Sequence, residues 1–125
     1  MEKIKVLLAD SSTFTRIILS NSLDAIGFEV VAIAKNGREA IDKFNELSPD
    51  ITLIDLALEG IDGIEVVRAL TTQNPAAAVA LLLPEDKDDP DIIVEAVRAG
   101  AKAYIKKPMS SEEVERRLSN LLNRR

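Results

Sequence analysis

Short apolar runs alternate five times with stretches whose apolar residues recur at helical spacing, and this alternation constrains the fold more than any other feature. Such runs are typical of parallel strands that are covered by helices on both faces of a sheet. The sequence therefore predicts one α/β domain over residues 1–125, a doubly wound (βα)5 unit with a five-stranded parallel sheet. The predicted strands are 4–9, 28–34, 51–54, 78–83 and 103–105.

Helix boundaries follow from glycine and serine positions. Gly27 and Gly100 end the first and fourth predicted helices, and the run from Ser110 to Glu113 is typical of a helix start. We expect the inward faces of the five helices to be Leu19, Leu23 and Ile26; Ala40, Ile41, Phe44 and Leu47; Val66, Val67 and Leu70; Ile93, Ala96 and Val97; and Val114, Leu118, Leu121 and Leu122.

Composition excludes several kinds of chemistry. The chain has no Cys and no His, so it offers no thiol nucleophile, no thiolate metal site and no imidazole base. A metal would need oxygen ligands, which favours Mg²⁺ or Mn²⁺. The net charge of −5 argues against direct nucleic-acid binding. The start Met1–Lys5 is too short and polar for a signal peptide, and no apolar run approaches the roughly 20 residues of a membrane span. We therefore expect a cytoplasmic protein.

Three charged residues follow predicted strands. Asp10 comes after the first strand, Asp55 after the third and Lys107 after the fifth. Function in doubly wound sheets collects at the carboxyl ends of the strands, where these residues would meet. Two nearby carboxylates repel unless a cation is present, and Mg²⁺ or Lys107 would supply one. A carboxylate placed there can also act as a nucleophile towards phosphorus.

Each of these signals has a simpler interpretation. Asp10 could be a helix N-cap, although Ser11 or Ser12 could cap instead, and Asp55 could be a loop residue. The Lys107–Pro108 dipeptide could be a plain strand exit, and Tyr104 a core aromatic. We interpret the acidic run 85–89 as a solvated loop, because its acids lack the spacing of a calcium loop.

The ordered set of these residues resembles the receiver domain of bacterial two-component response regulators, including the chemotaxis regulators. The resemblance covers nearly the whole chain and implies the flavodoxin-like strand order 2-1-3-4-5. The segments that carry it are Val6–Ser12 with Arg16, Asn36–Ala40, Pro49–Asp55, Gly60–Gly63, Ala99–Ala101 and Tyr104–Pro108.

This resemblance implies a role for each site residue. Asp55 would accept the phosphoryl group, and Asp10 would help to hold Mg²⁺, with the backbone carbonyl of Ala57 as a further metal ligand. Lys107 would contact the phosphoryl group, and its bond to Pro108 is often cis in the family. Tyr104 matches the aromatic residue that changes rotamer on activation.

Four positions depart from the family pattern. Ser11 stands where a second acidic metal ligand is usual, which weakens the predicted metal site. Leu83 replaces a hydroxyl residue that bonds the phosphoryl group, and Pro84 lacks the N–H that normally points at it. Glu59 replaces a proline. These departures concern phosphoryl chemistry and leave the predicted fold unchanged.

Two functions remain in competition. In the first, a sensor histidine kinase or phosphotransfer protein phosphorylates Asp55, and the last two helices with the fifth strand pass on the signal or form a homodimer. In the second, a degenerate receiver binds proteins without phosphorylation. Enzyme alternatives are weaker: aspartate-nucleophile phosphatases need an acid where Ala57 stands, and a flavin phosphate at 11–15 would lack a Trp or an aromatic-rich loop for the ring. Beyond self-phosphorylation and dephosphorylation at Asp55, we expect no enzyme activity.

Overall fold

Strands and helices alternate along the whole described chain. The computed structural model describes residues 3–87 and 89–123, without the side chain of residue 123. Met1 and Glu2, on which part of the signal-peptide argument rests, lie outside this range. Within it the elements are β1 (Lys5–Ala9), α1 (Thr13–Ala25), β2 (Glu29–Ala34), α2 (Gly37–Leu47), β3 (Ile51–Asp55), α3 (Gly63–Gln73), β4 (Val79–Leu83), α4 (Pro90–Ala99), β5 (Ala103–Lys106) and α5 (Ser111–Asn123).

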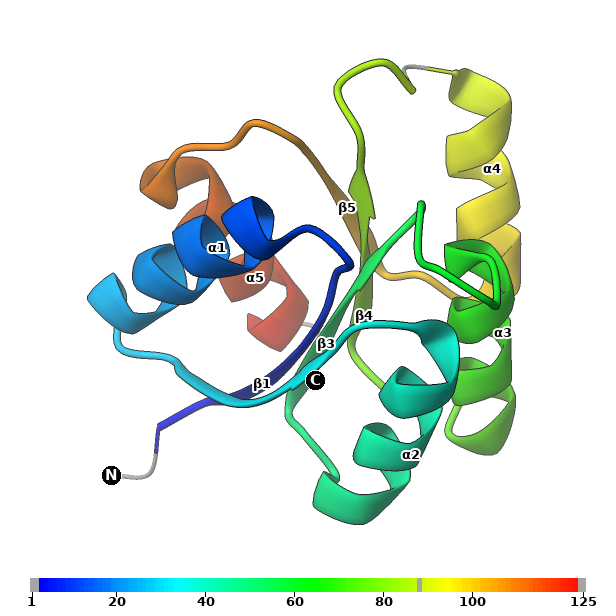
Figure 1. Ribbon diagram of the computed structural model, residues 1–125, viewed down its shortest axis with the longest axis horizontal. Coiled ribbons are helices and arrows are strands. Elements are labelled where there is room, and N and C mark those ends of the chain that lie inside the picture. Colours follow the sequence, from blue (N-terminus) through cyan, green and yellow to red (C-terminus); the bar gives the residue numbers. More distant parts are fainter. Residues whose placement is uncertain (1–2, 88, 124–125) are drawn as a thin grey trace.

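All five strands form one parallel sheet in the order β2-β1-β3-β4-β5, as the family resemblance implied. Helices α1 and α5 cover one face, and α2, α3 and α4 cover the other (Figure 1). The chain reverses its direction of strand addition after β2, so β1 and β3 are central neighbours. This adjacency brings the ends of β1 and β3 together at one edge of the sheet.

Each face of the sheet has its own apolar core. Leu8 and Leu53 pack with Leu19, Leu23, Val114 and Leu118 under α1 and α5. Ile54, Leu81 and Leu83 belong to the opposite core with buried residues of α2, α3 and α4. Neighbouring residues of a strand point to opposite faces, which is why β1 is apolar after Lys5, β3 is apolar except at Thr52 and Asp55, and β4 is wholly apolar.

Most of the predicted helix ends are correct. Gly100 ends α4 in the left-handed conformation, at φ 114°, and the Ser110 hydroxyl accepts a hydrogen bond from the Glu113 N–H at the start of α5. Ser12 caps α1 by accepting from the Thr15 N–H at 3.3 Å.

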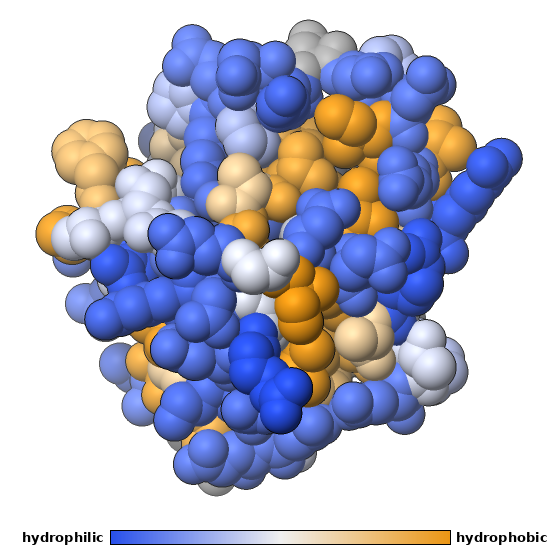
Figure 2. All heavy atoms as spheres, turned by 45° about the vertical axis from the view of Figure 1, so that its right-hand side comes forward, coloured by the Kyte–Doolittle hydropathy of each residue, from blue (hydrophilic) through white to orange (hydrophobic). Residues whose placement is uncertain are grey.

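The predicted inward face of α4 is wrong at Val97. This residue is 61% exposed, whereas Ala96 and Ala99 are buried and Ile92 and Ile93 pack partly against the core. Figure 2 shows apolar atoms exposed among hydrophilic ones on the side of the molecule that α4 occupies. The apolar spacing allowed the buried stripe to continue through either Val97 or Ala99, which lie about 100° and 60° from Ala96 on opposite sides around the helix axis.

The acidic run after β4 lies outside any helix or strand, as predicted. Its described residues Glu85, Asp86, Lys87 and Asp89 are exposed, and Asp88 lies outside the described residues. None of the helices in 3–87 and 89–123 is long and apolar enough to cross a bilayer.

Candidate functional site

Three predicted site residues meet at the carboxyl edge of the sheet. Lys107 Nζ lies 2.7 Å from Asp10 Oδ2 and 3.1 Å from Asp55 Oδ2, so a single ammonium bridges the two carboxylates. The side chain of Asp10 is fully buried, and those of Asp55 and Lys107 are 6% and 16% exposed. The residues come from the ends of β1, β3 and β5, which explains how a sequence span of 97 residues closes into one cluster.

Asp10 is not the cap of α1. Its Oδ1 accepts a hydrogen bond from the Ser12 N–H at 2.8 Å, and its Oδ2 accepts from Lys107, while Ser12 itself caps the helix. The buried carboxylate therefore has a charged partner and a backbone donor, as burial of a charge requires. The N-cap interpretation of Asp10 is wrong.

Asp55 is the last residue of β3 rather than a loop residue. Its Oδ1 accepts from the Ala57 N–H at 3.2 Å and its Oδ2 from Lys107. Burial raises the pKa of the Asp55 carboxyl above its usual value of 3.8, and the negative charge of Asp10 raises it further. The Lys107 ammonium and the two hydrogen bonds lower this pKa but do not cancel the rise.

Backbone geometry holds Lys107 in place. Its N–H donates to the Leu83 carbonyl at 2.9 Å, and its bond to Pro108 is cis, as the resemblance implied. The ammonium thus reaches across the end of β4 to the carboxylates of β1 and β3. With one ammonium against two carboxylates, the cluster keeps a negative charge that favours an added cation.

Ser11, the position with the neutral replacement, bonds elsewhere. Its hydroxyl donates to the Lys35 carbonyl at 3.0 Å and accepts from the Glu59 N–H at 3.3 Å. Lys35 lies in the loop after β2, on the other side of Asp10 from Lys107, and Glu59 lies in the loop after β3. The N–H of Glu59, which replaces a proline of the family pattern, takes part in this contact, and the sequence signal for it is that positions 11 and 59 both depart from that pattern.

The predicted switch positions lie within packed structure. Leu83 is fully buried in the core shared with α4, and Tyr104 is half-buried against the same core. The Arg117 guanidinium lies 4.9 Å from the centre of the Tyr104 ring, and Arg117 also pairs with Glu113 at 3.2 Å. Tyr104 is therefore held by packing on one side and by a cation–π contact on the other.

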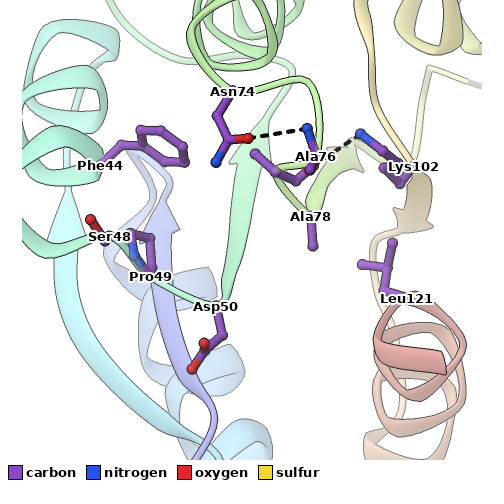
Figure 3. Close-up of a pocket in the computed structure, with 10 residues that line it drawn as sticks. Phe44, Ser48, Pro49, Asp50, Asn74, Ala76, Ala78, Lys102 and Leu121 are labelled. Atoms are coloured by element: carbon purple, nitrogen blue, oxygen red, sulfur yellow. Dashed lines mark hydrogen bonds between the residues drawn. The ribbon is translucent and has the colours of Figure 1, made fainter. Parts of the chain in front are cut away.

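A cavity of about 600 Å³ lies at the opposite end of the sheet. Figure 3 shows it between Phe44, Pro49 and Leu121, with Lys102 at one side. Lys102 Nζ donates to the carbonyls of Pro75 and Ala77 at 3.0 Å each, so it ties together the loops that precede β4 and β5. The cluster at the carboxyl edge is the better candidate for function than this mainly apolar hollow, because it joins a carboxyl of raised pKa, Asp55, to two charged partners.

The comparisons with known proteins agree with this geometry. Residues 6–119 match the family model described as the response regulator receiver domain. The chain is 33% identical to the chemotaxis protein CheY of Listeria monocytogenes over 111 residues, which are 89% of this chain and 92% of that protein. It is 39% identical to a protein-glutamate methylesterase/protein-glutamine glutaminase of Myxococcus xanthus over 106 residues, 84% of this chain but 30% of that protein.

Solved structures show the same fold. The response regulator domain of Thermotoga maritima CheB has a TM-score of 0.82 and 30% identity, covering 98% of this chain and 96% of that one. A LuxR-family two-component response regulator from Aurantimonas has a TM-score of 0.91 and 26% identity, covering 99% and 88%. The sequence match, the strand order and the shared architecture lead to one conclusion: this chain belongs to the response regulator receiver domain family.

Proposed function

We propose that the whole chain is one receiver domain of a cytoplasmic phosphorelay and that Asp55 accepts the phosphoryl group. The observation that carries this proposal is the convergence of Asp10, Asp55 and Lys107 within one ion-pair cluster. A buried carboxylate at the end of a central strand, beside a second carboxylate and an ammonium, suits phosphoryl transfer better than it suits a purely structural role.

The chemistry needs a donor outside the chain, because the chain has no His. A phosphohistidine of a sensor kinase or phosphotransfer protein is the donor we propose. An Asp55 carboxylate oxygen attacks phosphorus, the P–N bond breaks, and the imidazole leaves with the electron pair. The Lys107 ammonium, already within 3.1 Å of Asp55, neutralises charge on the transferring group.

The oxygen groups beside Asp55 fit a magnesium ion with several retained waters. Asp10, Asp55 and the carbonyl of Ala57 would hold it, since hard oxygen ligands suit Mg²⁺ and Mn²⁺. Among residues 3–87 and 89–123 no group of three or more acidic, His or Cys residues is suitably clustered for a metal, so the fit rests on two carboxylates. A bound Mg²⁺ would neutralise negative charge on the phosphoryl oxygens.

A second candidate function is protein binding without phosphorylation. It is favoured by Leu83, which is fully buried and offers no hydroxyl to a phosphoryl group, and by Pro84, which has no N–H. Mass spectrometry after incubation with acetyl phosphate and Mg²⁺ distinguishes the two candidates. The phosphorelay function requires a phosphoryl adduct on the wild type that is absent from Asp55→Asn, and an unmodified wild type would favour the second candidate.

We propose that partners or a second copy bind the face formed by α4, Tyr104 and α5. A hollow of about 260 Å³ lies there, lined by Ala96, Val97, Tyr104 and Arg117 among others. Val97, which lines this hollow, is 61% exposed, and Val94 of the same helix is 47% exposed. Charged residues of α5 border the apolar centre, an arrangement in which charge complementarity selects the partner.

Charge reversal tests this face. Arg116→Glu changes a side chain that is 65% exposed, and we expect about tenfold weaker partner or dimer binding from loss of steering and complementarity. Arg117→Glu is less informative, because Arg117 also contacts Tyr104. Arg38→Glu on α2, at an 82% exposed site, is the matched control, with binding measured by analytical ultracentrifugation or calorimetry. If only the control variant weakens binding, the face is misassigned.

A further inference from the structure

The Ser11 hydroxyl connects three loops at the carboxyl edge of the sheet. It sits in the loop after β1, donates to the Lys35 carbonyl after β2 and accepts from the Glu59 N–H after β3. A hydroxyl can donate and accept at the same time, which a carboxylate cannot do. Both capacities of Ser11 are used by backbone groups that are 24 and 48 residues away in the chain.

The same loops touch at further points around Ser11. The Gly37 N–H donates to the Glu59 carbonyl at 3.3 Å, and Asn36 and Glu59 form an isolated parallel bridge. A Cβ at Gly37 would lie 2.7 Å from the Cβ of Ile61, so the loop after β3 packs directly on the start of α2. The loop 56–62 is thus pressed against α2 by backbone contacts that the Ser11 hydroxyl completes.

We propose that Ser11 is a positioning residue, a clamp that holds the loop 56–62 against the start of α2 and so sets the backbone that follows Asp55. The consequence for phosphorylation rests on the function proposed above. The clamp itself rests on the contacts of Ser11, Lys35 and Glu59 alone. In this interpretation Ser11 is not a weakened metal ligand.

The departures from the family pattern at Ser11 and Glu59 then serve the same contact. The clamp needs a hydroxyl at position 11 and an N–H at position 59, and a proline at position 59 would supply no N–H. An aspartate at position 11 could still accept from Glu59 but could not donate to the Lys35 carbonyl. The two positions should therefore depend on each other in their energetic effect.

The clamp acts on the site through Ala57. The N–H of Ala57 donates to Asp55 Oδ1, and Ala57 belongs to the clamped loop. Lys107 links the end of β5 to the ends of β1 and β3, while Ser11 links the end of β1 to the loops after β2 and β3. Asp55 is consequently held by two sets of contacts, those of Lys107 to its carboxylate and those of Ser11 to the loop that follows it.

Amide hydrogen exchange, followed residue by residue by NMR without any phosphoryl donor, tests the clamp. The reporter is the Gly37 N–H, which donates to Glu59 and is present in every variant. Glu59→Pro should speed its exchange by roughly three- to tenfold, the effect of losing one hydrogen bond, and Ser11→Ala, which removes two, should speed it at least as much. Because Ser11→Ala already removes the Ser11–Glu59 contact that Glu59→Pro breaks, the double variant should exchange little faster than the Ser11→Ala variant.

Two further variants sharpen the result. Ser11→Thr keeps a hydroxyl and should restore slow exchange at Gly37. Ser12→Ala removes the neighbouring hydroxyl, which caps α1, and should speed exchange at Thr15 while leaving Gly37 unchanged. Unchanged exchange at Gly37 in Ser11→Ala, or independent additive effects of Ser11→Ala and Glu59→Pro, would overturn the clamp.

Labelling of Asp55 by acetyl phosphate separates this inference from the proposed function. If the clamp positions the loop for phosphorylation, Ser11→Ala and Glu59→Pro should both label several-fold more slowly, and Ser11→Thr should label at the wild-type rate. A wild type that does not label contradicts the proposed function, but the exchange result still decides whether the clamp exists. Normal labelling of both variants, despite faster exchange at Gly37, would overturn the positioning role.

Discussion

Replacing Lys107 by methionine tests the ion-pair cluster most directly. Methionine keeps most of the length of the side chain but removes the ammonium that lies 2.7 Å from Asp10 and 3.1 Å from Asp55. Breaking a buried ion pair costs about 3–5 kcal/mol, because it leaves an uncompensated buried charge. Against a typical domain stability of about 5–15 kcal/mol, this is a large fraction. We therefore expect a marked loss of stability near neutral pH.

The loss should depend on pH because Asp55 can take up a proton. Its pKa is already raised by burial and by Asp10, and removal of Lys107 takes away the charge that lowers it. A carboxyl whose pKa is raised in the folded state contributes stability below its unfolded pKa, and that contribution is lost as pH rises through the folded pKa. The destabilisation by Lys107→Met should therefore be smaller at about pH 5 than at about pH 8.

Urea unfolding followed by circular dichroism measures this difference. Saturating Mg²⁺ should recover part of the loss, since a ligand at about 100 times its dissociation constant stabilises by about 2.7 kcal/mol. Lys43→Met is the matched control, because Lys43 pairs with Glu46 at 3.7 Å on the surface, where a pair contributes about 0.2–1 kcal/mol. The reasoning is refuted if Lys107→Met costs no more than the control, or if its cost is the same at both pH values.

Three further predictions concern the same site. Asp55→Asn should be more stable than the wild type near neutral pH, because the raised pKa of Asp55 marks an unfavourable buried charge. This gain in stability should shrink as pH falls through the pKa of folded Asp55, and urea unfolding at several pH values measures it. Mg²⁺ should bind weakly. Although the Ser11 hydroxyl itself bonds to the Lys35 carbonyl, Ser11→Asp adds a negative charge next to Asp10 and should bind Mg²⁺ more tightly in calorimetric titration; unchanged or weaker affinity would contradict a position 11 near the metal site. Beryllofluoride, a phosphoryl mimic, should barely shift the NMR signals around Tyr104, whereas Leu83→Thr with Pro84→Ala should couple them to the site; large cooperative shifts in the wild type would contradict this.

The structure adds a reason to expect a fixed Tyr104. The contact between Arg117 and the Tyr104 ring is worth about 0.5–1 kcal/mol at a partly exposed site, and a bias of that size shifts a two-state equilibrium several-fold. A phosphoryl group with equal affinity for both states would not overcome this bias. Tyr104 is the only Tyr and the chain has no Trp, so tyrosine fluorescence reports this position alone.

Much of the site was predictable because a parallel sheet brings the carboxyl ends of its strands to one edge. Asp10, Asp55 and Lys107 each follow an apolar run, and parallel strands end at a common edge, so their convergence needed only the adjacency of β1, β3 and the strands beyond. The assignment of Val97 to the core failed for a different reason. Helical spacing defines an apolar stripe but leaves its borders open, and packing against α3 decided that Ala99 is buried and Val97 is not.

What the sequence alone determined is therefore the alternating architecture, the strand ends that carry charge, and the absence of thiol and imidazole chemistry. These follow from local periodicity and composition. Only the tertiary structure decided the partners of Ser11, Glu59 and Arg117, because each pairing depends on where loops or helices come to rest after the sheet forms. A hydroxyl, an amide N–H and a guanidinium can each bond to many kinds of group. The partner that each one takes is therefore set by which groups lie within reach in the folded chain.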